Sequence, residues 1–281
     1  MASMIKIVTD STAYVLPQDI ARYDIHVVPL RVIIGGKDFA EGVDITNEEF
    51  YRRLARYREV PTTSQPTVND FLQVYDKLTS LGHDILSIHI SGKLSGTVNS
   101  AMAAKSKFPQ ARIEVVDWLS MGMGLLVVAA ARAAEQGQEL SQIKATIKQI
   151  AETTSIIGTL DTLKYLHAGG RAGAKAMIAS LLKIKPVLAL DHGEVKVLAK
   201  PRSRSKAIQC MLQFVGQRVK ENSVIHGAVV HAMAREEALV IEKEIRDHYR
   251  CAELYLIELG PVFGAHTGPG VLGIVFYLDQ F

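Results

Sequence analysis

Strand-like and helix-like segments alternate along almost the whole of this 281-residue chain. Short runs rich in β-branched residues, at 5–9, 84–90 and 112–116, are separated by stretches with helical periodicity. Such alternation is typical of an α/β fold with largely parallel strands, because each parallel connection needs a crossover that is usually a helix. The sequence therefore predicts an α/β fold.

The length of the chain favours two domains, since it exceeds the size at which one hydrophobic core is usual. A long helical stretch at 119–151, with a break near Gln136-Gly137, precedes a change of pattern at Ile156. We predict an N-terminal α/β domain over residues 1–155 and a C-terminal α/β domain over residues 156–281.

Local signals mark several element boundaries in the first half. Pro17 suits the first turn of a short helix, and the β-branched run His26–Ile34 is closed by two glycines. Thr46-x-x-Glu49 has the form of a capping box, and Thr67-x-x-Asp70 resembles the same device with Asp in place of Glu or Gln. Both predict helix starts.

Composition excludes several function classes. The net charge of +3 is too small and too scattered for a nucleic-acid-binding surface. Cys210 and Cys251 are far apart and outside any metal-ligand spacing, so we expect no metal site, free thiols and a cytoplasmic location. The most apolar run, 125–134, is shorter than the roughly 20 residues that span a bilayer. We expect no transmembrane segment, and transient contact with a membrane stays open.

Two hydroxyl-rich stretches, Thr62–Thr67 and Ser91–Thr97, lie where an extended segment is expected to give way to a helix. A helix start presents backbone N–H groups without helical partners, and these suit a carboxylate or a phosphate. Neither stretch carries an obvious group to attack such an anion. The pattern therefore favours anion binding over catalysis.

The segment Asp10-Ser11-Thr12 follows the first predicted strand. Open α/β sheets commonly place ligands at the carboxyl ends of their strands. The alternative is a turn in which these side chains fix the chain reversal. We assign Asp10, Ser11 and Thr97 a supporting role around the anion site.

Five segments in the same order resemble the DegV family of bacterial two-domain fatty-acid-binding proteins. The segments, which span nearly the whole chain, are Val8-Thr9-Asp10-Ser11-Thr12, Thr63-Ser64-Gln65-Pro66, Leu94-Ser95-Gly96-Thr97, Gly169-Gly170-Arg171 and the glycine-rich segment around His266. The resemblance implies two α/β domains with a long-chain fatty acid held between them in an apolar tunnel. It also implies a non-catalytic subunit that presents the acid to a separate ATP-dependent fatty acid kinase, without a cofactor of its own.

Carried onto this sequence, the resemblance makes Thr63 and Ser95 the leading carboxylate donors. Ser64 and the backbone near Gly96 complete this part of the predicted site. Arg171 and His266 resemble family positions around the head group and the opening that faces the kinase. The plainer alternatives are that the hydroxyls cap turns and helices, and that Arg171 and His266 are solvated.

Two other functions remain as alternatives. Ser95 with His266 as its base would suit a hydrolase or acyltransferase, but Ser95 is not within a Gly-x-Ser-x-Gly elbow. ATP binding by this chain is disfavoured because Leu94 follows Gly92-Lys93 where a phosphate-binding loop needs Ser or Thr. A soluble phosphorylated ligand at the same anion site is the second alternative.

Overall fold

The computed structural model describes residues 4–56, 60–118, 121–168, 184–191 and 194–279. The chain forms two compact units. The first contains Met1–Val32, Asp38–Asp44 and Thr63–Glu152, and the second contains Ile33–Lys37, Ile45–Thr62 and Thr153–Phe281. The chain passes from the first unit to the second at 152/153, near the boundary expected at residue 155, and two short segments of the first half, 33–37 and 45–62, belong to the second unit.

The first unit is built on a four-stranded parallel sheet in the order β2-β1-β6-β7. Its strands are β1 (Ile5–Asp10), β2 (His26–Val28), β6 (Asp84–Ile90) and β7 (Ile113–Trp118). Its helices are η1 (Ser11–Ala13), α1 (Pro17–Tyr23), α3 (Val68–Ser80), α4 (Thr97–Lys105), α5 (Met123–Glu135) and α6 (Leu140–Thr153). The predicted break between α5 and α6 is confirmed, and Gly137 there has φ +77°.

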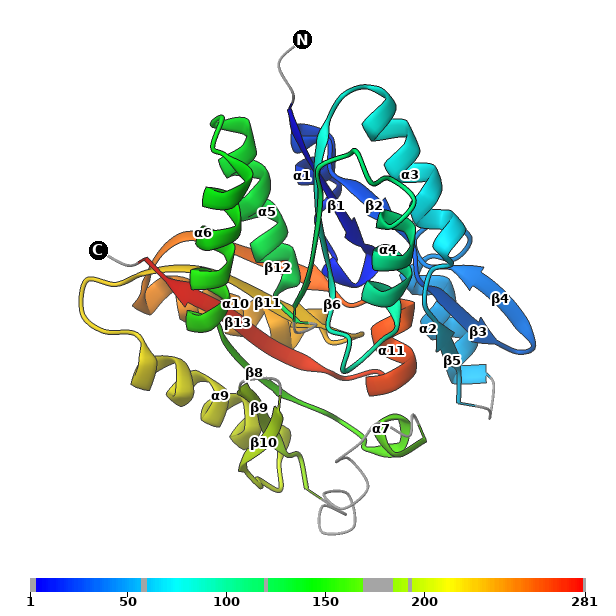
Figure 1. Cartoon of the computed structure of the whole chain (residues 1–281). Coiled ribbons are helices and arrows are strands. Elements are labelled where there is room, and N and C mark those ends of the chain that lie inside the picture. The colour runs from blue at the N-terminus through cyan, green and yellow to red at the C-terminus, as the bar shows by residue number, and fades with distance from the viewer. Residues whose placement is uncertain (1–3, 57–59, 119–120, 169–183, 192–193, 280–281) are drawn as a thin grey trace. The chain divides into compact units, whose positions relative to one another are not determined.

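Both faces of this sheet are buried, as parallel sheets require. Ile7 packs in a core with α5 and α6, whereas its neighbour Val8 packs in a second core with α3 and α4. Figure 1 shows the two helix pairs on opposite sides of β1 and β6. The sheet is therefore held rigidly between two helix layers, and its carboxyl edge is left for loops.

The second unit is built on a six-stranded mixed sheet in the order β10-β9-β8-β13-β11-β12. Its strands are β8 (Ser155–Thr159), β9 (Val187–Asp191), β10 (Glu194–Ala199), β11 (Val224–His231), β12 (Arg250–Glu258) and β13 (Leu272–Leu278). Its helices are α2 (Asn47–Arg56), α7 (Lys164–Ala168), α9 (Arg204–Arg218), α10 (Arg235–His248) and α11 (Pro261–Thr267). One face of the sheet forms a core with α9 and α10.

The run His26–Ile34 is two strands rather than one. It divides at Pro29-Leu30 into β2 and β3 (Arg31–Ile34), and β3 joins a small sheet in the order β4-β3-β5 with β4 (Lys37–Ala40) and β5 (Thr62–Ser64). Pro29 has no N–H for a strand ladder, which explains the break. Among the helices that the structure describes, none is long and apolar enough to cross a membrane.

His226 lies between two carboxylates and links strands β11 and β12 with the end of β13 in the second unit. His226 Nδ1 lies 3.0 Å from Glu253 Oε1, its Nε2 lies 2.8 Å from Asp279 Oδ1, and its ring stacks on Tyr277. Tyr255 donates a hydrogen bond to the other oxygen of Glu253 at 3.0 Å. The hydrogen bond to Glu253 and the charge of Asp279 raise the pKa of His226 above its usual value of 6.5, against the effect of burial.

We expect the stability contributed by His226 to depend on pH. A raised pKa in the folded state gives stabilisation that is complete below the unfolded value and is lost as pH rises through the folded pKa. Replacing His226 with Gln should therefore cost on the order of 1 kcal/mol of unfolding free energy at about pH 6 and less at about pH 8.5. Urea unfolding of H226Q at both pH values, with H248Q at an exposed histidine as the control, measures this. An equal cost at both values would contradict it.

Candidate functional site

The carboxyl edge of the parallel sheet contains a topological switch point. The chain leaves β1 toward β2 on one side and returns through α3 to β6 on the other side. The loops that follow β1 and β6 therefore diverge at this edge, which is the place where open α/β sheets bind ligands. The Asp10-Ser11-Thr12 segment follows β1 here, and the Ser91–Thr97 segment follows β6.

The start of α4 brings backbone N–H groups and two hydroxyls together. Gly96 is its N-cap residue and has no side chain to cap the helix, but Ser95 Oγ accepts a hydrogen bond from the Thr97 N–H at 3.4 Å. Ser95 Oγ lies 2.8 Å from Thr97 Oγ1, and the Ser95 N–H bonds the carbonyl of Ser91 at 3.0 Å. The first N–H groups of the nine-residue helix and two hydroxyls thus converge, with the positive end of the helix dipole behind them.

The start of α3 is different, because it supplies its own anion. Thr67 and Asp70 form a complete capping box, in which Asp70 Oδ2 accepts from the Thr67 N–H at 2.7 Å. The predicted helix start is confirmed, but Thr63 and Ser64 lie before it on β5 rather than at the helix. The first turn of α4, by contrast, carries no acidic residue.

The two stretches meet through Gln65. Its side chain lies across Gly96, and its Nε2 donates to Ser100 Oγ on α4 at 3.2 Å. The segment that carries Thr63 and Ser64 is thereby attached to the first turn of α4.

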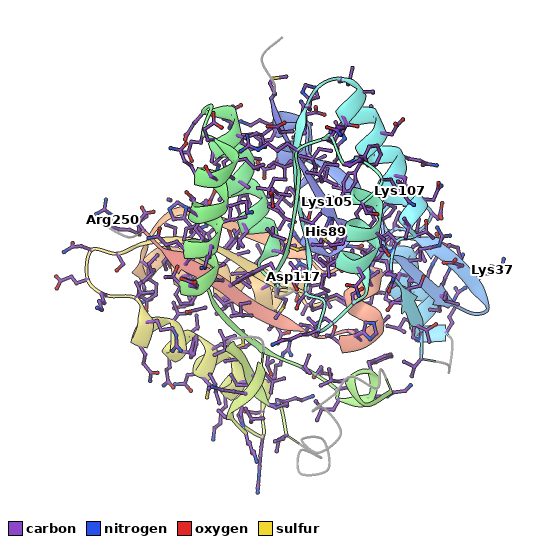
Figure 2. The ribbon with its side chains drawn as sticks, in the orientation of Figure 1. Lys37, His89, Lys105, Lys107, Asp117 and Arg250 are labelled. Carbon is purple, nitrogen blue, oxygen red and sulfur yellow. The ribbon has the colours of Figure 1, made fainter. Side chains whose placement is uncertain are left out.

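Asp117 supports the Ser91–Thr97 loop from the neighbouring strand. It accepts a hydrogen bond from the Gly92 N–H at 3.0 Å, and Ser91 Oγ lies 3.5 Å from the same oxygen. Figure 2 labels Asp117 on β7 and His89 on β6, and these two residues are direct partners in the sheet register. Asp117 thus fixes the side of the loop that follows β6.

Beneath this loop, Asp10 lies at the end of a buried polar chain. Its two oxygens accept from the Thr12 N–H at 3.0 Å, from Thr12 Oγ1, and from the Ile90 N–H at 2.9 Å. His89 Nδ1 lies 3.1 Å from the same carboxylate, and His89 Nε2 lies 2.6 Å from Ser87 Oγ. Every contact in this chain is satisfied when His89 donates through Nδ1 to the carboxylate and accepts from Ser87 through Nε2.

Tyr75 completes this chain by donating to Ser87 Oγ at 2.7 Å. Burial raises the pKa of Tyr75, which keeps its phenol protonated. The order of Ser87, His89 and Asp10 resembles a catalytic triad, but all three side chains are fully buried. This buried series of hydrogen bonds therefore fixes the ends of β1 and β6, and its serine is not presented to a substrate.

The other two supporting residues also point inward or into the loop. Ser11 accepts from the Leu30 N–H at 3.0 Å and donates to the buried Glu41, which also accepts from Tyr14. Thr97 is fully buried beside Ser95. Both side chains therefore bond within the fold, and their supporting role around the anion site stays a prediction.

His266 belongs to the second unit and lies in the last turn of α11, not in a loop as expected. The helix forms because Pro261 occupies its first turn, where a missing N–H costs nothing. A Cβ on Gly264 would lie 2.7 Å from Phe50 Cε1 and from the Tyr51 hydroxyl oxygen of α2, so this glycine allows the two helices to pack closely. Arg171 lies outside the described residues.

Sequence reasoning missed Gln65, Asp117, Ser87 and His89. A signal existed for the last two, since they alternate on one face of an otherwise apolar strand. A parallel strand buried on both faces forces such residues to find internal partners. In the part of the chain that the structure describes, no cluster of His, Cys, Asp or Glu could hold a metal ion.

Comparison with known proteins identifies relatives over the full length. A family model described as "Uncharacterised protein, DegV family" matches residues 4–279. A DegV domain-containing protein of Streptomyces coelicolor is 37% identical, covering 98% of this chain and 99% of the relative.

Two solved structures have the same fold. One, described as fatty acid binding of a DegV family protein from Thermus thermophilus, has a TM-score of 0.91 at 34% identity and covers 98% of this chain and 100% of that one. A stearic acid-binding protein from Eubacterium ventriosum has a TM-score of 0.88 at 28% identity and covers 98% of each chain. The family match and these full-length similarities lead to one conclusion: the chain belongs to the DegV family.

Proposed function

We propose that the protein binds a long-chain fatty acid, with the carboxylate at the start of α4. The observation that carries this proposal is the start of α4, which has no acidic residue in its first turn and where Ser95 and Thr97 converge at the switch point of the sheet. Solved relatives of the same fold and length are described as fatty-acid-binding proteins, which supports the same ligand here.

The proposed head-group site offers a carboxylate hydrogen-bond donors and the positive end of a helix dipole. Ser95 and Thr63 donate to the carboxylate oxygens, with Ser64 beside them, and the backbone near Gly96 completes the site. Hydrogen bonds to a charged group contribute roughly 1.5–3 kcal/mol each. The acyl chain supplies most of the affinity, at about 0.8 kcal/mol for each buried CH₂. The head group then sets the orientation of the acid.

A titration of delipidated protein tests this proposal. Oleate should bind, and methyl oleate, which has the same chain without the anionic head, should bind at least tenfold more weakly, as expected for about 1.5 kcal/mol or more. Equal binding of the two would exclude a carboxylate site. Binding of inorganic phosphate in place of oleate would favour the alternative of a soluble phosphorylated ligand.

The proposal extends to a separate ATP-dependent kinase subunit that phosphorylates the bound acid. It rests on the family resemblance, and it gives Arg171 and His266 positions around the head group and the opening that faces the kinase. An R171A variant should then reduce acyl phosphate formation with a cognate kinase more than it reduces oleate binding. Equal losses in both assays would place Arg171 in the binding site itself.

A further inference from the structure

Gln65 reaches from the end of β5 to the first turn of α4. Thr63 and Ser64 precede it on β5, and the buried Pro66 follows it. Its Nε2 donates to the hydroxyl of Ser100, a residue only 5% exposed, at 3.2 Å. Although Gln65 is an exposed residue, its amide group bonds the buried Ser100.

The Gln65 side chain occupies the space beside Gly96 where other residues carry a Cβ. A Cβ at residue 96 would lie 2.0 Å from Gln65 Oε1, 2.6 Å from its Cδ and 2.7 Å from its Nε2. The backbone of Gly96, at φ −76° and ψ 8°, is accessible to any L-residue. The glycine therefore leaves room for the Gln65 amide, which a larger residue would displace, and the conformation of the chain does not demand it.

We propose that Gln65 is a positioning residue of the head-group site, which sets the spacing between Thr63-Ser64 and the start of α4. This inference rests on the proposed function. Beyond Pro66, the capping box of Thr67 and Asp70 fixes the start of α3. Gln65 is the side chain that extends from this fixed segment to Gly96 and Ser100. Gln65 therefore links the segment that carries Thr63 and Ser64 with the first turn of α4.

Two substitutions of Gln65 separate positioning from simple structural support. Q65A removes the attachment and should weaken oleate binding roughly three- to tenfold, as expected for the loss of one neutral hydrogen bond. Q65E places a carboxylate of the same shape at the positive end of α4, where it competes with the ligand. Q65E should weaken binding by a further factor of about ten and should not lower the melting temperature of the delipidated protein. Q73E, at an exposed glutamine on α3, is the matched control for the added charge.

The Gly96 contact provides a second test. G96A must displace the Gln65 side chain, because the amide occupies the position of the new methyl group. If Gly96 acts through Gln65, G96A should weaken oleate binding, and the double variant G96A/Q65A should bind no more weakly than Q65A alone.

The outcomes distinguish this inference from the proposed function. If the wild-type protein binds oleate and the Q65A and Q65E variants bind it equally well, the role of Gln65 is overturned and the fatty acid site stays intact. Additive losses in G96A and Q65A would also overturn it, because Gly96 would then act independently of Gln65. Failure of the delipidated wild-type protein to bind oleate would instead reject the proposed function.

Discussion

Replacing Asp10 with Ala should destabilise the protein by about 3–5 kcal/mol, because it removes a buried acceptor and leaves the groups bonded to it without a partner. The substitution removes the acceptor of the Thr12 and Ile90 N–H groups and of His89 Nδ1. Asp10 and His89 are fully buried, so water at the surface does not take the place of the lost carboxylate as the acceptor for these groups.

The milder substitution D10N keeps the shape but turns one acceptor into a donor. Donors approach both oxygens of Asp10, so the new NH₂ group must face one of them, and we expect a loss of about 2 kcal/mol. Urea unfolding of D10A and D10N measures both effects. D38A removes an exposed carboxylate paired with Arg31 and serves as the control, with an expected change below about 1 kcal/mol. A D10A protein as stable as D38A would contradict the role of the buried chain.

The double variant T63A/S95A should lose more than about 100-fold in oleate affinity, since each hydroxyl donates to a charged group in the proposed complex. Both side chains are partly exposed, and neither substitution removes core volume, so the fold should be retained. Equilibrium binding of oleate to the delipidated variant measures the loss, and thermal unfolding verifies the fold.

A matched control is available in the same two elements. Thr62 is the exposed neighbour of Thr63 on β5, and Ser106 lies at the opposite end of α4, where it donates to the Ala103 carbonyl. T62A/S106A should bind oleate like the wild type. Unchanged affinity in T63A/S95A, or an equal loss in both double variants, would remove Thr63 and Ser95 from the head-group site.

Local signals predicted much of the fold. The Thr67-x-x-Asp70 box and the break between α5 and α6 were predicted from short stretches of sequence, because their physics is local. Thr46-x-x-Glu49 forms only in part: Thr46 Oγ1 accepts from the Glu49 N–H at 3.2 Å, while the Glu49 carboxylate pairs with Arg53 one turn later. A competing ion pair of this kind is visible in the sequence only after the helix is known.

Contacts between distant residues could not be predicted in this way. The attachment of Gln65 to Ser100 joins residues 35 apart, and that of His89 to Asp10 joins residues 79 apart. The membership of residues 33–37 and 45–62 in the second unit likewise depends on tertiary packing. Periodicity identifies which face of an element is buried, but not which polar partner lies opposite it.

The central claim is that this protein holds a long-chain fatty acid, and native mass spectrometry of the freshly purified chain tests it most directly. We expect a species heavier than the chain by one fatty acid, with the added mass lost on denaturation and identified as a long-chain acid after solvent extraction. A chain that carries no added mass, and that gains none when titrated with oleate after delipidation, would contradict the claim.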